Sequence, residues 1–149
     1  MNGFHNATRF AGATLLLLAI SGIVGQARAD DIPSPCTSLK RIVAARPGGF
    51  SRLTPEDGHG IAQPYGSDPR CEAVHGAFQC EWTPQQGAGS TTDALEGVAA
   101  DIASCLPDAT HDVNSPARQH FYLGERGNRT QIAVTTVGAG RIRLTVSGR

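Results

Sequence analysis

The segment 71-CEAVHGAFQCEW-82 carries two cysteines nine positions apart, with a His-Gly pair midway between them. If His75 and Gly76 form a two-residue turn, Cys71 and Cys80 face each other in a non-hydrogen-bonded pair of an antiparallel hairpin. Their Cα atoms would then lie about 4.5 Å apart, at the short end of the range that a disulfide accepts. Alternation in FQCEW places the second cysteine on the same face as both aromatic residues. The segment therefore predicts a hairpin whose two cysteines point into the core.

Helical periodicity marks one segment on each side of this hairpin. Residues 36–46, CTSLKRIVAAR, repeat apolar residues at helical spacing after a Ser-Pro pair that is typical of a helix start. Residues 90–106 carry a stronger pattern, with capping-box spacing between Ser90 and Asp93 and a stop at Pro107. Each segment has a single apolar stripe, so we expect two helices that cover one face of a sheet.

Three further strands are predicted after the second helix. Residues 118–124, 130–137 and 141–147 show strand patterns, and short turn-rich segments separate them. The expected order is α-β-β-α-β-β-β. Hairpin-connected strands with one polar face favour an antiparallel sheet of about five strands, and two helices can cover its apolar side. The expected fold of residues 30–149 is therefore a single α+β domain.

The segment 47–70, between the first helix and the hairpin, is rich in glycine and proline and has no sustained hydrophobic period. Long loops inside compact domains are often functional. A variable excursion without a function is the alternative, and the sequence leaves both open. If the loop binds a partner, Phe50, Tyr65 and Arg70 are the natural contact residues, because aromatic residues and arginine dominate binding energy at interfaces.

Residues 1–29 have the pattern of a secretory signal peptide. A basic residue precedes an apolar core at residues 10–25, and Ala27 and Ala29 occupy the small positions expected before a cleavage site. The core is short for a membrane span, so cleavage is favoured over an uncleaved anchor. The expected product is an exported protein, periplasmic or extracellular, with no membrane span after cleavage.

All four cysteines follow the predicted signal peptide. An even number in a small exported domain indicates two disulfides. No C-x-x-C pair is present, so the usual spacings of a zinc site and of a redox motif are both missing. The hairpin register favours Cys71–Cys80, which leaves Cys36–Cys105 to join the two helices. The alternative, in which each hairpin cysteine pairs with a helix cysteine, stays open.

The net charge argues against binding to nucleic acid or anionic lipid. The whole chain has 13 basic and 13 acidic residues, and removal of Arg9 and Arg28 with the signal peptide leaves 11 basic and 13 acidic residues. The resulting charge near −2 gives no sequence-independent attraction to polyanions. Arg141 and Arg143 alternate with apolar residues, so they are typical of the solvated face of a strand. We expect no nucleic-acid partner.

No catalytic constellation or metal site emerges from the sequence. The strongest candidate for a nucleophilic triad is His111, Asp112 and Ser115, but residues this close on one loop rarely align as base, orienter and nucleophile. The segment 56-EDGH-59 offers carboxylates beside a histidine, yet it lacks the ligand spacing of a calcium loop. No catalytic residue, metal or cofactor is therefore predicted.

The order of CTSLKRIVAAR, CEA…FQCEW and a capped helix that ends in ASCLPD resembles a pattern found in small exported bacterial four-cysteine proteins of α+β fold and uncharacterised function. The resemblance covers most of the chain after residue 29. Its motifs are architectural, so it implies a disulfide-stabilised fold and no particular activity. The order of elements is also similar to that of secretion-chaperone and small-inhibitor folds.

The function that the sequence favours is an exported, disulfide-stabilised, non-catalytic module that binds a protein partner or a small ligand in the cell envelope. Its contact surface would be the segment 47–70 or an exposed face of the sheet, and an inhibitor-like or immunity-like role is one version. One alternative is a small periplasmic enzyme with a site assembled from Glu56, His59 and His111, and another is a purely structural envelope protein. A pocket with converging titratable groups would favour the enzyme, and a flat or apolar exposed patch of roughly several hundred Å² would favour the binding module. Absence of both would leave the structural role.

Overall fold

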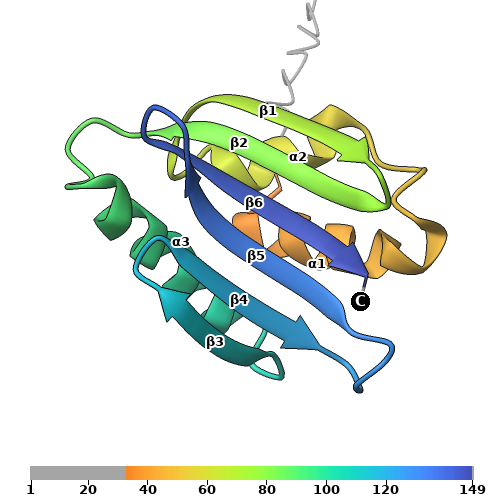
Figure 1. Ribbon diagram of the computed structural model, residues 1–149. Helices are drawn as coiled ribbons and strands as arrows, with labels where there is room; N and C mark the ends of the chain where they lie inside the picture. Colours follow the sequence, from red (N-terminus) through yellow and green to blue (C-terminus); the bar gives the residue numbers. More distant parts are fainter. Residues whose placement is uncertain (1–32, 149) are drawn as a thin grey trace, which may run out of the picture. The chain divides into compact units, whose positions relative to one another are not determined.

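The computed structural model describes residues 33–148, which form a six-stranded antiparallel sheet with three α-helices on one face (Figure 1). The elements are α1 (Pro35–Ala45), α2 (Pro55–Ala62), β1 (Gly66–Val74), β2 (Ala77–Pro84), α3 (Thr91–Cys105), β3 (Thr110–Ser115), β4 (Arg118–Leu123), β5 (Thr130–Val137) and β6 (Arg141–Gly148), with a 3-10 turn, Arg46–Gly48, after α1. The strands lie in the order β1-β2-β6-β5-β4-β3, so β1 and β3 are the edges. The predicted signal peptide, residues 1–29, lies outside the described residues.

The α+β class and the two disulfides are confirmed, but the described residues contain three α-helices where the sequence predicts two. The additional helix is α2, which lies within the predicted loop 47–70. Gly58 and Gly60 each make the helix less favourable by about 1 kcal/mol relative to alanine. The sequence of this segment therefore predicts a loop rather than a helix. The structure caps the helix at Thr54, whose backbone N–H donates a hydrogen bond of 2.8 Å to the carboxylate of Asp57.

The sheet has six strands where the sequence predicts about five. The additional strand is β3, which covers the polar segment 110-THDVNS-115 that is predicted as a loop. This strand is at the edge and pairs with β4 alone, so its sequence lacks the apolar alternation of a central strand. The observed order is α-α-β-β-α-β-β-β-β.

The hairpin formed by β1 and β2 has the register that the sequence predicts. His75 and Gly76 have φ angles of 50° and 72°, and such positive values are required by the type I′ turn of a two-residue hairpin. Cys71 faces Cys80, and their Cα atoms lie 4.1 Å apart. Both side chains are buried and joined by a disulfide on the helix side of the sheet.

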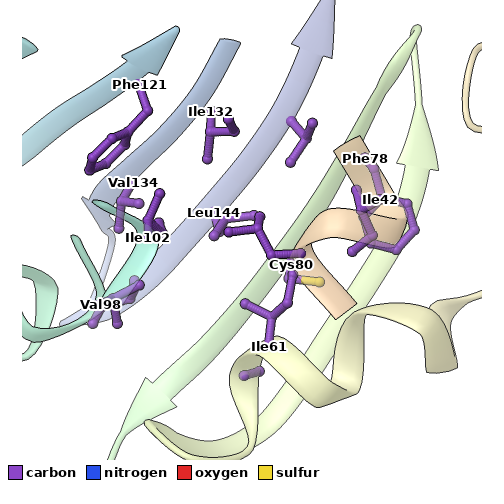
Figure 2. Packing of buried hydrophobic residues seen from close by; sticks show 14 of the residues in the cluster. Ile42, Ile61, Phe78, Cys80, Val98, Ile102, Phe121, Ile132, Val134 and Leu144 are labelled. Atoms are coloured by element: carbon purple, nitrogen blue, oxygen red, sulfur yellow. The ribbon is translucent and has the colours of Figure 1, made fainter. Parts of the chain in front are cut away.

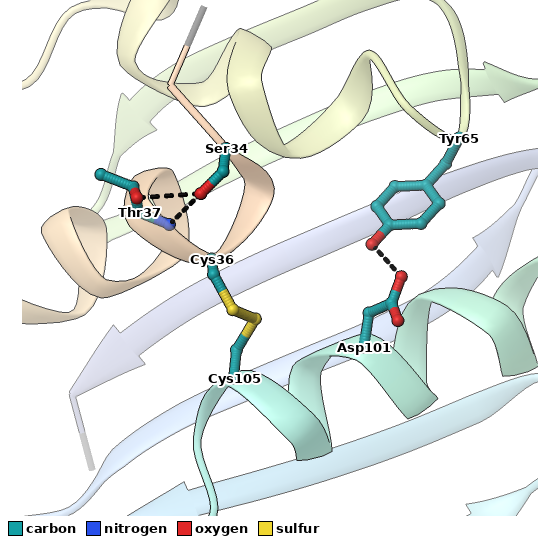
Figure 3. Close-up of a disulfide and its surroundings, with 6 residues drawn as sticks. All are labelled: Ser34, Cys36, Thr37, Tyr65, Asp101 and Cys105. Carbon is teal, nitrogen blue, oxygen red and sulfur yellow. Dashed lines mark hydrogen bonds between the residues drawn. A yellow bond between two sulfur atoms is a disulfide. The ribbon is translucent and has the colours of Figure 1, made fainter.

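The second disulfide joins the start of α1 to the end of α3. It links Cys36 to Cys105 across a sequence separation of 69 residues (Figure 3). The side chain of Ser34 caps α1 by accepting a hydrogen bond of 3.2 Å from the backbone N–H of Thr37. The two observed bonds are therefore the pair that the hairpin register favours.

The core lies between the sheet and the helices (Figure 2). Alternate residues of the four inner strands point to this side and are fully buried, namely Phe78, Cys80, Trp82, Ile142, Leu144, Val146, Ile132, Val134 and Phe121. The helices contribute Leu39 and Ile42 from α1, Ile61 from α2, and Leu95, Val98 and Ile102 from α3. Each of these large apolar side chains contributes about 1.5–3 kcal/mol through burial.

Helix α2 packs directly over the Cys71–Cys80 disulfide. A Cβ atom added to Gly58 would lie 2.7 Å from Cβ of Cys71 and would overlap the sulfur atoms of both cysteines. A Cβ atom added to Gly60 would overlap Oγ of Ser38 on α1. The glycines that weaken α2 as an isolated helix are thus the residues that allow it to approach the disulfide and α1.

Substitution of Gly58 tests this close approach. We expect Gly58→Ala to lower the free energy of unfolding by about 1–3 kcal/mol, because the added methyl group would overlap the disulfide. Gly97→Ala is the matched control, since Gly97 also lies in a helix but has open space where a Cβ atom would be. The control should raise the free energy of unfolding by about 0.5–1 kcal/mol. Urea denaturation measures both, and equal stabilisation of the two variants would contradict the packing described.

The two disulfides should contribute unequally to stability. Removal of the disulfide that closes the longer loop, in Cys36→Ala/Cys105→Ala, is expected to lower the free energy of unfolding by about 4 kcal/mol. Removal of the other disulfide, in Cys71→Ala/Cys80→Ala, should lower it by about 3 kcal/mol, because loop-closure entropy grows with loop length. Equilibrium denaturation of the two double variants gives the order. A larger loss of stability on removal of the Cys71–Cys80 disulfide would mean that its packing against α2 contributes more to stability than loop-closure entropy does.

Candidate functional site

The face of the sheet opposite the helices is polar, and no element of the described chain covers it (Figure 1). Its residues alternate with core residues along each strand. One row of neighbouring residues crosses all six strands on this face. From β1 to β3, the row consists of Arg70, Glu81, Arg143, Thr135, Arg118 and Ser115, and we call it the arginine row.

A groove of about 510 Å³ lies along the β6-to-β3 part of the arginine row. Its lining includes Ser115, Arg118, Thr135, Thr136 and Arg143. The backbone N–H of Thr136 donates a hydrogen bond of 3.0 Å to the carbonyl of Ala117, which ties the β3–β4 turn to β5. Guanidinium and hydroxyl groups both donate hydrogen bonds, so this outer-face groove suits a ligand with acceptor oxygens.

Glu81 holds two arginines of the outer face in place. Its Oε1 accepts a hydrogen bond of 2.5 Å from Nε of Arg143 and also pairs with Nη2 of that residue. Its Oε2 lies 3.7 Å from Nε of Arg141, which contacts Asp68 at 3.3 Å as well. Arg118 differs, because its side chain is exposed and makes no hydrogen bond or ion pair with the described part of the chain.

Aromatic residues lie on the same face, farther along β4. The guanidinium carbon of Arg129 is 5.7 Å from the centre of the Tyr122 ring. The centre of the His120 ring is 6.1 Å from the centre of the same tyrosine ring. Lys40 on α1 is the only lysine among the 13 basic residues of the sequence, so every basic residue of this face except histidine is an arginine. Tyrosine and arginine are enriched in protein interfaces, whereas lysine is depleted.

The structure separates the three contact residues predicted in the segment 47–70. Phe50 is only 1% exposed and belongs to the core, so its prediction as a contact residue is wrong. Gly49 and Phe50 both have positive φ angles, and the chain turns there in a way that directs the phenyl ring inward. Arg70 is exposed and is the first member of the arginine row.

Tyr65 is half-buried between α2 and β1. Its hydroxyl donates a hydrogen bond of 2.5 Å to the carboxylate of Asp101 on α3 (Figure 3). Burial, followed by the hydrogen bond to Asp101 and its negative charge, raises the pKa of Tyr65 well above its usual value. This residue therefore joins the start of β1 to α3.

The three residues of the predicted enzyme alternative do not come together. Glu56 and His59 lie on α2, which packs on β1 and β2, whereas His111 lies on β3 at the opposite edge of the sheet. Nε2 of His111 is 2.8 Å from Oε1 of Gln119, and its ring stacks on Phe121 with the centroids 4.2 Å apart. His111 therefore helps to hold the edge of the sheet.

The triad candidate is not assembled either. His111 and Asp112 are successive residues of a strand, so their side chains point to opposite faces of the sheet.

The carboxylates of the segment 56–59 are engaged in local contacts. The carboxylate of Asp57 accepts the capping hydrogen bond at the start of α2 and forms an ion pair of 2.9 Å with Arg41. Hydrogen bonds from its own backbone N–H and from Thr54 lower the pKa of Glu56. Within residues 33–148, no group of three or more His, Cys, Asp or Glu side chains could hold a metal ion.

A second pocket, of about 370 Å³, lies beside the edge strand β1. Its lining includes His59, Arg70, Glu72 and Glu81, so it brings several titratable groups together. The imidazole of His59 makes no hydrogen bond within the described residues. A general base held by an orienting partner is therefore not found here.

Comparison with known proteins found no family model and no curated protein that matches this sequence. Among residues 33–148, no helix is both long enough and apolar enough to cross a membrane.

Sequence reasoning finds single members of the arginine row but not the row. It identifies Arg70 as a contact residue and places Arg143 on a solvated face. The neighbours Thr135 and Arg118 come from strands whose pairing only the tertiary structure reveals. The alternation of polar residues along each strand was the available signal, and it defines the face without defining the register.

Glu81 should stabilise the protein through its two arginine partners. We expect Glu81→Gln to lower the free energy of unfolding by about 1 kcal/mol, because Arg141 and Arg143 lose a charged acceptor in a partly buried position. The control is Glu96→Gln, on the exposed face of α3, which should change stability by less than about 0.5 kcal/mol. Urea denaturation at low and high ionic strength provides the measurement. The difference between the variants should shrink with salt, and a difference independent of salt would contradict an electrostatic origin.

Proposed function

We propose that this protein is an exported, disulfide-stabilised binding module of the cell envelope, which binds a protein partner through the outer face of its sheet. The observation that carries the proposal is the arginine row, which crosses all six strands on a face that no described element covers. The inner face of the sheet is covered by the core and the helices, so the outer face is the only face of the sheet that the described residues leave open to a partner.

The composition of the outer face supports a protein partner. Arginine and tyrosine side chains lie among threonine, serine, glutamine, alanine, histidine and three carboxylate side chains, and the strands hold them in a fixed register. Rigid strands lose little conformational freedom on binding, which favours recognition by a broad and flat surface. Interfaces commonly combine arginine and tyrosine anchors with a polar rim.

Of the two contact surfaces that the sequence leaves open, the exposed face of the sheet is preferred to the segment 47–70. Much of that segment is folded as α2 and the start of β1, and Phe50 is in the core. Arg70 stays in the proposed contact surface as the β1 member of the arginine row. Tyr65 is engaged with Asp101 and is better explained as a structural contact.

Export is supported by two independent features. Disulfides persist in oxidising compartments and are rare in the cytosol, and the structure contains two. The predicted signal peptide at residues 1–29 gives the route. A periplasmic or extracellular location follows as part of the proposal.

A small enzyme is the second candidate, and the pocket beside β1 is the observation that favours it. His59, Arg70, Glu72 and Glu81 line that pocket. The binding module is preferred because His59 lacks the orienting hydrogen bond that a general base requires. Loss of a measured hydrolytic or transfer activity in His59→Gln, with the fold intact, would reverse this preference.

Site-specific photo-crosslinking in the producing cells tests the proposed contact surface. A photoreactive residue placed at Ala133 or Thr145, on the outer face of β5 and β6, should give a crosslinked protein adduct. The same residue at Ala100 or Ser104, on the exposed side of α3, is the matched control and should give none. Adducts from the helix positions alone, or from neither pair, would refute binding through the outer face.

A further inference from the structure

We propose that the outer-face groove binds a single carboxylate, presented by an aspartate or glutamate side chain of the protein partner. The inference rests on the proposed function, because it names the chemical group that the partner brings to the outer face. Arg118, Thr135 and Arg143 form the site. They are consecutive members of the arginine row on β4, β5 and β6, and all three line the groove of about 510 Å³.

The spacing of these three residues suits one small anion. Neighbouring strands lie about 4.8 Å apart, so the backbones at Arg118 and Arg143 are about 10 Å apart, with Thr135 between them. The exposed Arg118 side chain is long enough to reach toward Thr135, and Arg143, held by Glu81, lines the groove on the other side of the threonine. A carboxylate placed there accepts hydrogen bonds from both guanidinium groups and from the hydroxyl group.

The two arginines are prepared for binding in different ways. Arg118 is exposed and has no hydrogen-bond or ion-pair partner within the described residues, so its full positive charge is available. Arg143 uses Nε and Nη2 to bind Glu81, which fixes its guanidinium group and leaves Nη1 without an acceptor in the described chain. A side chain that is already fixed loses less conformational entropy when the ligand binds.

The surroundings of the groove favour one carboxylate over an extended polyanion. Glu72, Glu81 and Asp112 lie on the same face, in the arginine row and the row next to it. A nucleic acid or an anionic membrane laid across the sheet would meet these carboxylates as well as the arginines. Without residues 1–29, 11 basic and 13 acidic residues remain, so the net charge near −2 does not attract a polyanion over long range. The planar fork of arginine matches a single carboxylate in shape.

Binding of small probes tests the carboxylate site directly. An acetylated and amidated Gly-Glu-Gly tripeptide, its Gly-Gln-Gly counterpart and inorganic phosphate are titrated separately into the isotope-labelled protein at low ionic strength. We expect the glutamate peptide to bind in the millimolar range and to shift the backbone NMR signals of Arg118, Thr135 and Arg143. The glutamine peptide should cause no such shifts, because it lacks the charge that both arginines recognise.

Variants show whether the groove itself is responsible. Arg118→Gln should weaken binding of the glutamate peptide about tenfold, and Arg118→Lys should weaken it less, since charge is kept and the fork is lost. Arg126→Gln is the matched control on the exposed β4–β5 loop and should leave the affinity unchanged.

Three results would overturn the assignment. They are equal binding of the glutamine peptide, tighter binding of phosphate than of the glutamate peptide, and an equal loss in Arg118→Gln and Arg126→Gln. Failure of the probes to bind, with adducts still formed at Ala133 and Thr145, would refute the carboxylate site and leave the outer face as the contact surface. Probe binding without those adducts would support the carboxylate site and refute the contact surface proposed for the partner.

Discussion

The contact between α2 and the Cys71–Cys80 disulfide determines how the other helices are placed. The disulfide joins β1 to β2 on the helix side, and the bare backbone at Gly58 rests on it. Gly60 of the same helix packs against Ser38 of α1, and the Cys36–Cys105 disulfide joins α1 to α3. The hairpin, the three helices and the core are thereby connected through a series of close contacts. A side chain at either glycine would displace the helix from this position.

The sequence predicts the parts of this fold that depend on local pattern. The hairpin register follows from the turn at His75 and Gly76, and the capped helix α3 follows from its period. Helix α2 was missed because Gly58 is selected by a tertiary contact rather than by helix propensity. Strand β3 was missed because an edge strand needs little apolar alternation. The groove was missed for a third reason, since its residues meet only through strand pairing across the sheet.

The two faces of the sheet differ in burial and in charge. On the helix side, fully buried side chains fill the space and provide most of the stability. On the outer side, Glu81 and Asp68 pair with Arg141 and Arg143, so a cluster of arginines can be kept on a folded surface. Because the core and the proposed contact surface use opposite faces of the same strands, the outer residues can vary with little effect on the core. The proposed binding surface thus rests on a rigid support.

The Cys36–Cys105 bond makes the first part of the chain a covalent ring that contains all three helices and the first hairpin. A protease that cuts the exposed loop 85–89 would open this ring without releasing either fragment. The exposed loop 124–128 lies outside the ring, and a cut there would leave β5 and β6 attached only by strand pairing and core packing. Damage by proteolysis would therefore depend on which side of residue 105 the cut falls, and the part after residue 105, which carries all the residues that line the groove, is the more vulnerable one.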